Sequence, residues 1–320
     1  MKDAAVNSHP LDGAPRPRHS SGMAIKLGVD LGGTKTEIVA LDAGGEVLLR
    51  RRVPTGQGYG AILETIARLV REAEAELGAT GTVGVGIPGS INPHTGLVRN
   101  GNTQALNGNP LDKDLGALLG REVRVMNDAN CLAMSEAADG AGAGYPVVFA
   151  AILGTGCGGG WVVDGRPLDG LNRVAGEWGH TPLPWMRPEE FPGPACWCGR
   201  QGCLETFLCG PAIARDTDGP GHRDAGKVEA RALAGDPVAQ AGLARHADRL
   251  ARALAAIVNI MDPDVIVLGG GVSNYAHLYR DVPDLMAPWI FGDAKKVNLV
   301  RAKHGDSSGV FGAARLWDKS

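Results

Sequence analysis

The residues of this chain best suited to a defined chemistry are one histidine and three cysteines. His180 is followed, after a proline-rich stretch, by Cys196, Cys198 and Cys203. Three thiolates and one imidazole are the donor set of a closed, four-coordinate zinc site of the structural kind. The spacing therefore predicts a structural Zn²⁺ bound by these four side chains, in a loop over residues 180–205.

A disulfide between Cys196 and Cys198 is the alternative use of two of these thiols. The chain has only 6 cysteines among 320 residues, whereas small secreted domains that depend on disulfides are rich in cysteine. The start of the chain lacks the apolar run of a secretory signal. We therefore expect a cytoplasmic, reducing environment, in which thiols bind metal. The other cysteines are expected to be small buried side chains: Cys131, Cys157 and Cys209.

Two acidic residues flank the histidine and the thiols. Glu177 precedes His180 by three residues, and Glu205 follows Cys203 by two. Carboxylates accept hydrogen bonds from hydroxyl groups, and a zinc-bound imidazole can donate one from its second ring nitrogen. Several acceptors beside one donor suit the recognition of a sugar, so Glu177, His180 and Glu205 are candidate sugar ligands.

A further acid, Asp128, follows Asn127 at the end of the apolar stretch 123–126. An acid at the end of a buried strand, beside a cleft, is a candidate general base. An alternative of comparable weight is that Asp128 caps a helix over residues 129–138. The carboxylate can serve both roles only if it faces the cleft.

Two glycine-rich turns, at residues 30–35 and 154–158, are candidate phosphate-binding turns. Their glycines allow backbone N–H groups to approach anionic oxygens, Thr34 and Lys35 add donors, and Asp30 could hold Mg²⁺. One such turn alone is weak evidence because hairpins use Gly-Gly routinely. Two turns that face one cleft could hold a polyphosphate between them.

Each turn joins two predicted strands, and predicted helices alternate with further strands. This order predicts an α/β protein of two similar lobes with a cleft between them. Strands are expected at residues 25–31, 37–41, 46–49, 83–87, 123–126, 147–153, 161–163 and 265–268, and long amphipathic helices at 62–77 and 243–258.

The composition argues against some classes of partner. Lys and Arg number 32 against 35 Asp and Glu, so the net charge is −3, and neither nucleic acid nor an anionic membrane is an expected partner. No apolar run approaches the roughly 20 residues of a membrane-spanning helix. Residues 1–23 are polar and rich in Pro, Gly and Ser, and we expect them to form a disordered tail.

These motifs together resemble the repressor–ORF–kinase (ROK) family of sugar kinases, and within it most closely the bacterial fructokinases, also called manno(fructo)kinases. The family motifs are DLGGTKTE from Asp30, GVGIPGSINPHTG from Gly84, NDANCLA from Asn127, LGTGCGGG from Leu153, AGEWGH from Ala175, CWCGRQGCLE from Cys196 and DPDVIVLGGG from Asp262. The stretches closest to fructokinases are LNGNPLDKDL from Leu106, GEWGHTPLPW from Gly176 and KHGDSSGVFGAA from Lys303. Bacterial N-acetylglucosamine kinases share much of this pattern.

The resemblance implies an actin-like (ASKHA) sugar kinase fold of two lobes built on ribonuclease H-like units. The N-terminal lobe would comprise residues 24–126, with a C-terminal helix over 307–320 as a candidate addition. The C-terminal lobe would comprise residues 127–306 and include the zinc-binding loop 180–205. The breaker-rich stretch 210–226 and the turn before Cys196, which holds several prolines, depart from the family pattern, and we expect them to alter the rim of the sugar pocket.

The resemblance also implies ATP-dependent phosphorylation of a hexose, with fructose first and mannose second, by a homodimer that uses MgATP. N-acetylglucosamine kinase or glucokinase activity is the alternative. Asp128 is the implied base. The implied sugar ligands are Asn127, Asp128, Glu177, His180, Glu205, Gly89 and Ser90. The implied ATP-binding residues are Asp30, Gly32, Gly33, Thr34, Lys35, Gly154, Thr155, Gly156, Gly158, Gly269, Gly270 and Gly271.

A sugar-responsive transcription regulator is a remote alternative, because the family includes repressors. Those proteins carry a helix-turn-helix domain before the kinase-like part. Only 29 residues precede Asp30 here, most of them in the tail expected to be disordered, and we expect these to be too few for such a module.

Overall fold

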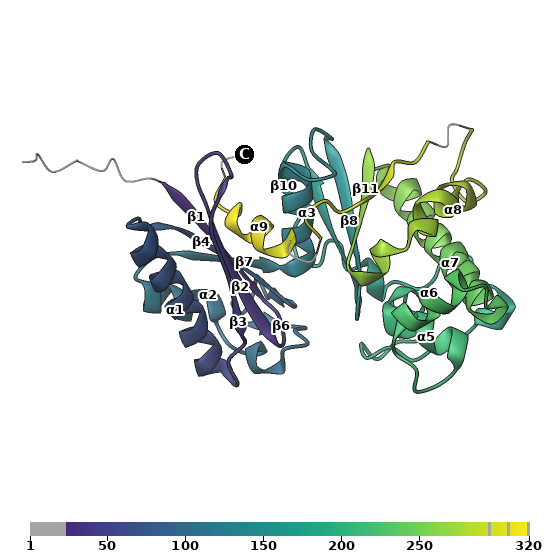
Figure 1. Ribbon diagram of the computed structural model, residues 1–320, viewed down its shortest axis with the longest axis horizontal. Coiled ribbons are helices and arrows are strands. Elements are labelled where there is room, and N and C mark those ends of the chain that lie inside the picture. Colours follow the sequence, from purple (N-terminus) through teal and green to yellow (C-terminus); the bar gives the residue numbers. More distant parts are fainter. Residues whose placement is uncertain (1–23, 294–295, 306–307, 319–320) are drawn as a thin grey trace, which may run out of the picture.

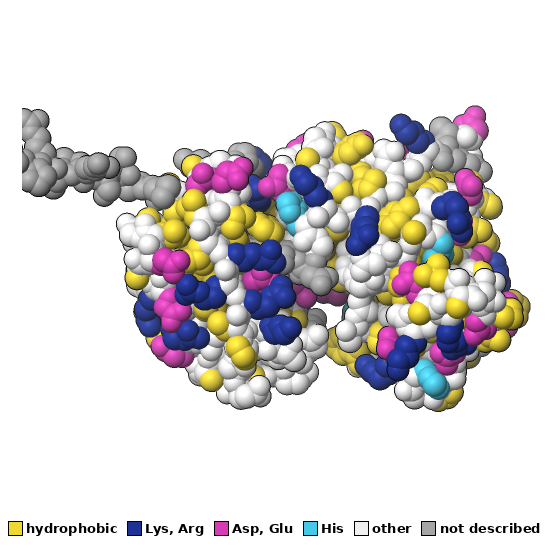
Figure 2. Space-filling model, in the orientation of Figure 1, with side chains coloured by type: hydrophobic (Ala, Val, Ile, Leu, Met, Phe, Trp, Pro, Cys, Tyr) yellow, Lys and Arg dark blue, Asp and Glu magenta, His cyan; other side chains and the backbone are white. Residues whose placement is uncertain are grey.

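The computed structural model describes residues 24–293, 296–305 and 308–318, so the predicted tail 1–23 lies outside the described residues. Two lobes lie side by side, and helices α3 (Asp128–Ala138) and α9 (Ser308–Ala314) lie between them (Figure 1). The surface is indented between the lobes (Figure 2).

The first lobe is built on a five-stranded sheet of order β3-β2-β1-β4-β7. Strands β1 to β3 are antiparallel, and β4 and β7 run parallel to β1. Helix α1 buries its apolar stripe, which includes Ile62, Ile66 and Leu69, in the core of this lobe. The elements are β1 Ile25–Leu31, β2 Lys35–Leu41, β3 Val47–Pro54, α1 Tyr59–Leu77, β4 Gly81–Ile87, β5 Ser90–Ile91, β6 Val98–Arg99, η1 Gln104–Leu106, α2 Leu111–Leu119 and β7 Val123–Asn127.

Helix α9 packs against this same sheet, although it comes from the C-terminal end of the chain. A Cβ atom on Gly28 would lie 2.1 Å from the Val310 carbonyl oxygen, and one on Gly84 would lie 1.9 Å from that of Ala313. Side chains at these two strand positions would therefore push the helix off the sheet. Helices α9 and α3 also pack closely, since a Cβ on Gly312 would overlap the Cys131 carbonyl at 1.7 Å.

The second lobe repeats the plan of the first, with a sheet of order β10-β9-β8-β11-β12. Helices α7 and α8 pack over one face of this sheet, and α3 contacts β8 and β9. The elements are β8 Val147–Leu153, β9 Cys157–Val163, β10 Arg166–Pro167, η2 Trp178–His180, η3 Pro188–Glu190, α4 Glu205–Leu208, α5 Gly210–Asp218, α6 Ala225–Leu233, α7 Pro237–Met261, β11 Val265–Gly269, η4 Gly271–Asn274, α8 Ala276–Met286 and β12 Leu299–Arg301.

The strand–turn–strand unit predicted twice from the sequence is confirmed. Leu31 pairs with Thr36 across the first glycine turn, and Leu153 pairs with Cys157 across the second. Two local predictions need correction. The strand expected at residues 46–49 continues to Pro54 as β3. The helix expected to begin after an Asp128 cap includes Asp128, and Asn127 is the cap, since its side chain accepts from the Ala129 and Asn130 N–H groups.

The segment between η2 and α4 contains little regular structure, and a buried ion cluster attaches it to α7. Glu190, which is 8% exposed, accepts hydrogen bonds from Arg249 Nε at 2.9 Å and Arg252 Nη2 at 2.7 Å. The Arg252 side chain is wholly buried. Burial opposes the Glu190 charge, but the hydrogen bonds from Arg252, the Arg187 N–H and Arg249 outweigh it and lower the pKa of Glu190 to about 2.

We expect Glu190→Gln to lower the free energy of unfolding by about 3 kcal/mol at neutral pH, because it leaves buried guanidinium groups without their counter-charge. Urea unfolding followed by tryptophan fluorescence measures the change. The difference between the two proteins is complete above pH 4.5, the ordinary pKa of the group, and shrinks as the pH falls toward 2. Asp281→Asn, which removes an exposed pair with Arg280, is the control and should cost under about 1 kcal/mol. Equal effects of the two substitutions would contradict the assignment.

Candidate active site and metal centre

The structure brings the four predicted zinc ligands together. One ligand atom from each of His180, Cys196, Cys198 and Cys203 lies within 4.8 Å of the others. The Cys198 and Cys203 sulfurs are 3.6 Å apart, and Cys196 Sγ lies 3.6 Å from His180 Nδ1. A tetrahedral ion with zinc–sulfur bonds of about 2.3 Å requires sulfurs roughly 3.8 Å apart. The donor set and its spacing therefore fit Zn²⁺, and the described residues contain no disulfide between these thiols.

The cluster fixes the orientation of the His180 ring. Nδ1 faces the thiols, which leaves Nε2 for another partner. The ring of Trp197 meets that of His180 edge to face, with centroids 4.9 Å apart. Glu177 lies one turn earlier, since the His180 N–H donates to its carbonyl at 3.2 Å in η2. The short helix thus places an acid and an imidazole at the same site.

Glu205 is held by two donors. Cys157 N donates to Oε2 at 3.0 Å, and Trp197 Nε1 donates to Oε1 at 2.8 Å. A Cβ on Gly156 would lie 2.8 Å from Oε2, so a side chain there would displace the carboxylate. The second glycine turn thus positions Glu205, and it lines a different cavity from the first turn.

The carboxylate of Glu177 has no hydrogen bond to any residue within the described part of the chain. Burial raises its pKa, the His180 and Arg99 side chains act against that rise, and Glu205 adds to it. An acceptor that is partly desolvated and not yet engaged is suited to a ligand hydroxyl.

Asp128 lies at the first position of α3, beneath the cleft. Its Oδ1 accepts from the Ala129 N–H at 2.8 Å. Burial raises the pKa of Asp128 to about 6 against this hydrogen bond, and the charge of Glu177 adds to the rise. Asn127 donates from Nδ2 to the Gly89 carbonyl at 3.1 Å, and Ser90 pairs with Arg99 between β5 and β6. The carboxylate is therefore charged at neutral pH and able to accept a proton.

A cavity of about 260 Å³ between the lobes contains both Asp30 and Asp128. Burial raises the pKa of Asp30 to about 7, and the charges of Asp128 and Glu37 contribute to the rise. Two neighbouring carboxylates that oppose each other's ionisation fit a divalent cation, which Asp30 would hold. The predicted residues in this lining are Asp30, Gly32, Gly33, Asp128 and Gly270, and the lining also includes Asn102.

A second cavity of about 600 Å³ is lined by Gly154, Thr155 and Gly271 together with residues of α5 and α6. The breaker-rich stretch 210–226 contributes Gly210, Pro211 and residues 223–226 to it. Helix α5 begins beside Gly154, whose carbonyl accepts a hydrogen bond from the Gly210 N–H, and the effect of this stretch on the sugar pocket stays a prediction. The stretch lies on the side of the predicted nucleotide turns.

Five residues predicted to bind ATP line neither cavity: Thr34, Lys35, Gly156, Gly158 and Gly269. The carbonyls of Thr34 and Lys35 accept hydrogen bonds from Thr55 N and Gly32 N. Gly158 accepts from the Trp178 indole, and Gly269 lies buried in β11 against Leu132. These five residues serve the backbone structure around the turns and strands. The other seven predicted ATP-binding residues line the two cavities.

Sequence reasoning missed Arg99 and Trp197. Arg99 reaches across from β6, donates to the Asn172 carbonyl of the second lobe and acts on the charge of Glu177. Its place in a short strand gives no local signal of this role.

Trp197 lies within the CWCGRQGCLE motif. Its position between two predicted metal ligands could have indicated that it lies near the candidate site.

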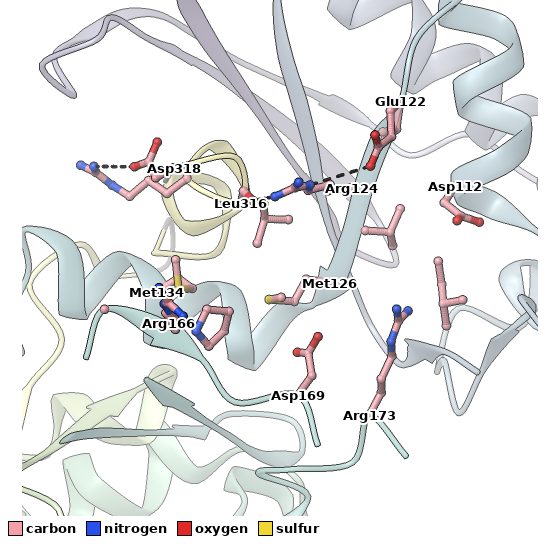
Figure 3. A pocket seen from close by; sticks show the side chains of 16 residues that line it. Asp112, Glu122, Arg124, Met126, Met134, Arg166, Asp169, Arg173, Leu316 and Asp318 are labelled. Carbon is pink, nitrogen blue, oxygen red and sulfur yellow. Dashed lines mark hydrogen bonds and ion pairs between the residues drawn. The ribbon is translucent and has the colours of Figure 1, made fainter. Parts of the chain in front are cut away.

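A third cavity, of about 510 Å³, lies between β7, the end of α9 and the β10 segment (Figure 3). Among the predicted site residues it contains none. Three of its four arginines have an acid nearby: Arg124 lies 3.9 Å from Glu122, Arg315 lies 3.8 Å from Asp318, and Arg173 acts on the charge of Asp169. The balance of charge gives this cavity no evident selectivity for an anion.

Within the described residues, no helix has both the length and the apolar character needed to cross a membrane.

We expect Cys198→Ser to lower bound zinc from about one ion per chain to well below that, and to lower the melting temperature, because the metal ties the loop to the lobe. Elemental analysis and thermal unfolding measure the two effects. Cys131→Ala removes a buried thiol outside the cluster and should leave the zinc content unchanged. The metal site would be disproved if wild-type protein stripped of zinc had the same melting temperature as protein purified without chelator.

Comparison with known proteins agrees with this architecture. The ROK family model matches residues 26–320. The N-acetyl-D-glucosamine kinase of Escherichia coli (strain K12 / DH10B) is 40% identical over 296 residues, which cover 90% of this chain and 98% of that protein. The crystal structure of the ROK hexokinase from Thermus thermophilus is 34% identical with a TM-score of 0.80, over 91% of this chain and 96% of that one.

A ROK family glucokinase from Streptomyces griseus, solved in complex with glucose and AMPPNP, is 28% identical with a TM-score of 0.72, over 92% of this chain and 99% of that one. The family model spans both lobes. This chain belongs to the ROK family, and its two lobes have the actin-like fold of the family's sugar kinases.

Proposed function

We propose that this chain transfers the γ-phosphoryl group of ATP to the primary hydroxyl of a hexose, with Asp128 as the base. The observation that carries the proposal is the position of Asp128. It lies in the interlobe cavity with the first glycine turn, and the charge of Glu177 from the imidazole–acid set acts on it. A carboxylate that lies beside the first glycine turn and responds to the charge of Glu177 is suited to act between a phosphate and a sugar hydroxyl.

The acceptor would bind through the polar groups that lack a committed partner. Glu177 accepts from sugar hydroxyls, and His180 donates from Nε2 while its Nδ1 faces the thiols. Asn127 and Glu205 complete the set, and both are already fixed by hydrogen bonds to the backbone or an indole. Groups fixed before binding lose little freedom when the sugar arrives.

Asp128 would accept the proton of the primary hydroxyl as the oxygen attacks the γ-phosphorus. The new oxygen–phosphorus bond forms while the bond to the β,γ-bridging oxygen breaks, and ADP leaves. The transition state is loose, so alignment and charge neutralisation matter more than strong basicity. Mg²⁺ bound with ATP supplies charge neutralisation at the phosphates, and Asp30 would hold it. Closure of the lobes over the cleft excludes water, which otherwise competes as the acceptor.

Fructose is the hexose we propose first, on the motifs that resemble fructokinases. N-acetylglucosamine is the second candidate, because relatives that bear that name are 40% identical to the chain. The solved relatives are named a hexokinase and a glucokinase, so glucose belongs in the test. A homodimer in the cytoplasm remains a prediction from the family resemblance.

We expect Asp128→Asn to lower kcat by about 10²-fold or more while sugar affinity changes little, because the amide cannot take the proton. Coupled ADP release measures kcat, and calorimetry with the sugar measures affinity. Asp169→Asn, another acid whose pKa is raised by burial but which lies in the third cavity, is the matched control and should retain activity within about threefold. Near-normal turnover of Asp128→Asn would refute the base.

The wild-type pH profile provides an independent check. Asp128 must be deprotonated to act, and its pKa is about 6, so kcat/KM should fall about tenfold per pH unit below that value. The residual activity of Asp128→Asn should lack this acidic limb.

We expect the wild-type protein to phosphorylate fructose with a higher kcat/KM than mannose, glucose or N-acetylglucosamine. The measurement is coupled ADP release with each sugar at several concentrations. A highest kcat/KM for N-acetylglucosamine would replace the first candidate by the second, and release of ADP with none of the four would contradict the proposed reaction.

A further inference from the structure

One segment of the chain crosses from the second lobe back to the first, and it forms part of the wall of the interlobe cavity. The crossing segment begins after β12, an edge strand of the second sheet, and ends in α9, which packs on the sheet of the first lobe (Figure 1). Within it, Gly305 and Gly309 line the cavity of about 260 Å³ that contains Asp30 and Asp128. The position of the crossing segment therefore affects the shape of this cavity.

Gly309 lies directly against the Asp30 carboxylate. A Cβ atom on Gly309 would lie 3.2 Å from Asp30 Oδ1 and 3.3 Å from its Cγ, so the backbone of the glycine forms the surface that faces the carboxylate. Asp30 is the residue proposed to hold the cation that accompanies ATP. A shift of Gly309 would therefore change the space available beside that cation.

Glu136 holds the crossing segment in place. It lies in the last turn of α3 and is wholly buried. Its Oε2 accepts a hydrogen bond from Lys303 N at 3.0 Å, and its Oε1 accepts from His304 N at 3.1 Å and from Ser308 Oγ at 2.9 Å. A fourth donor, Ala141 N, reaches Oε2 at 2.8 Å. A single carboxylate thus binds the crossing segment at three of its residues.

The four donors match what a carboxylate can accept. An ionised carboxyl group has about four lone-pair sites and no proton to donate, and every partner of Glu136 named above donates an N–H or O–H group. An amide in its place has one oxygen, and its NH₂ group would face other donors. Because a buried donor left without an acceptor is costly, Glu136→Gln should loosen the crossing segment while it nearly preserves the side-chain volume.

Helix α3 carries both this anchor and the proposed base. Asp128 is the first residue of the helix, and Glu136 follows it on the same helix. The helix also packs closely on α9, since a Cβ on Gly312 would overlap the Cys131 carbonyl. The base and the group that holds the opposite wall of the cavity therefore belong to one element.

We propose that Glu136 is a positioning residue for phosphoryl transfer: through its hydrogen bonds to the crossing segment, it holds the cavity wall against Asp30 and so shapes the site for the phosphates of MgATP. This inference rests on the proposed function, because it takes the interlobe cavity as the place of the cation and the phosphates. The candidate sugar ligands Glu177, His180 and Glu205 lie on a different segment, so the role concerns the donor and not the acceptor.

The test compares wild type with Glu136→Gln. We expect kcat/KM for MgATP to fall by about tenfold or more, since a misplacement of about 1 Å can cost up to about 10²-fold. The affinity for the sugar should stay within about threefold, because its ligands do not contact the crossing segment. Coupled ADP release with varied MgATP measures the first quantity, and calorimetry with the sugar measures the second. A lower melting temperature with wild-type kcat/KM for MgATP per folded molecule would show a merely structural role and overturn the proposal.

Ser135→Ala is the matched control. Ser135 is the neighbouring residue on α3, is equally buried, and its hydroxyl has no hydrogen-bond partner in the described part of the chain. Its substitution should leave kcat/KM for MgATP within about threefold of wild type. A loss as large as that of Glu136→Gln would show that any change in this turn of α3 disturbs the site, and would overturn the specific role of Glu136.

Ser308→Ala provides a milder variant in case Glu136→Gln does not fold. It removes one of the four donors and leaves α3 unchanged. We expect kcat/KM for MgATP to fall by about threefold or more, because a hydrogen bond to a charged group is lost, and sugar affinity to stay at the wild-type value. A wild-type kcat/KM for MgATP in Ser308→Ala would contradict the proposal.

Calorimetric titration with MgADP separates this inference from the proposed function. If wild type releases no ADP with any of the four sugars, the proposed reaction fails, and MgADP binding then decides the role of Glu136. Binding to Glu136→Gln that is weaker by about tenfold supports the role, and equal binding contradicts it. If wild type transfers phosphoryl groups but Glu136→Gln equals it in turnover and in MgADP binding, only the role of Glu136 fails.

Discussion

The proposed sugar site depends on holding one long irregular segment, residues 177–205, against the rest of the second lobe. Apart from η2 and η3, this segment has no helix, and it contributes only isolated bridges to a sheet. Each ordered residue without such support costs about 1–2 kcal/mol of backbone entropy. The thiol–imidazole cluster offsets that cost near the site, and the Glu190 ion cluster offsets it at the far side of the segment. Without the thiol–imidazole cluster, the loop that carries His180 and Glu205 would not be held at a common point.

Several carboxylates lie close to one another in and beside the interlobe cleft, and their charges repel. A cation or a hydrogen-bond donor that binds there reduces this repulsion. The pKa of Asp30, Asp128 and Glu177 is raised in each case, first by burial and then by another carboxylate of the set. Hydrogen-bond donors from a sugar and the positive charge of a cation relieve this cost. The same desolvation keeps Asp128 a moderately strong base, because a carboxylate with an ordinary pKa takes up a proton less readily.

Local sequence patterns predicted the features that depend on near neighbours. The spacing of Cys196, Cys198 and Cys203 indicated the metal cluster, and alternating apolar residues indicated the hairpins around both glycine turns. Contacts between distant segments were beyond such patterns. The position of the stretch 210–226 is one example, because only tertiary packing places α5 beside Gly154. Asp128 and Asn127 could exchange the capping role on sequence alone, and the extended backbone of Asn127 decides between them.

The proposed phosphate donor and the proposed sugar would be bound by different parts of the chain. This difference explains where selectivity for a ligand can vary. The glycine turns offer backbone N–H groups, which any phosphate satisfies and which side-chain substitution hardly changes. The loop 180–205, which holds the thiol–imidazole cluster, offers side chains instead. At position 197 the backbone is fixed by its neighbours Cys196 and Cys198, while the side chain remains largely uncovered. A residue whose backbone is restrained and whose side chain is exposed can be replaced by a larger or smaller residue without disturbing the core. If the proposed function holds, acceptor selectivity can vary through the side chains of the loop, whereas the backbone of the glycine turns is constrained by the fold.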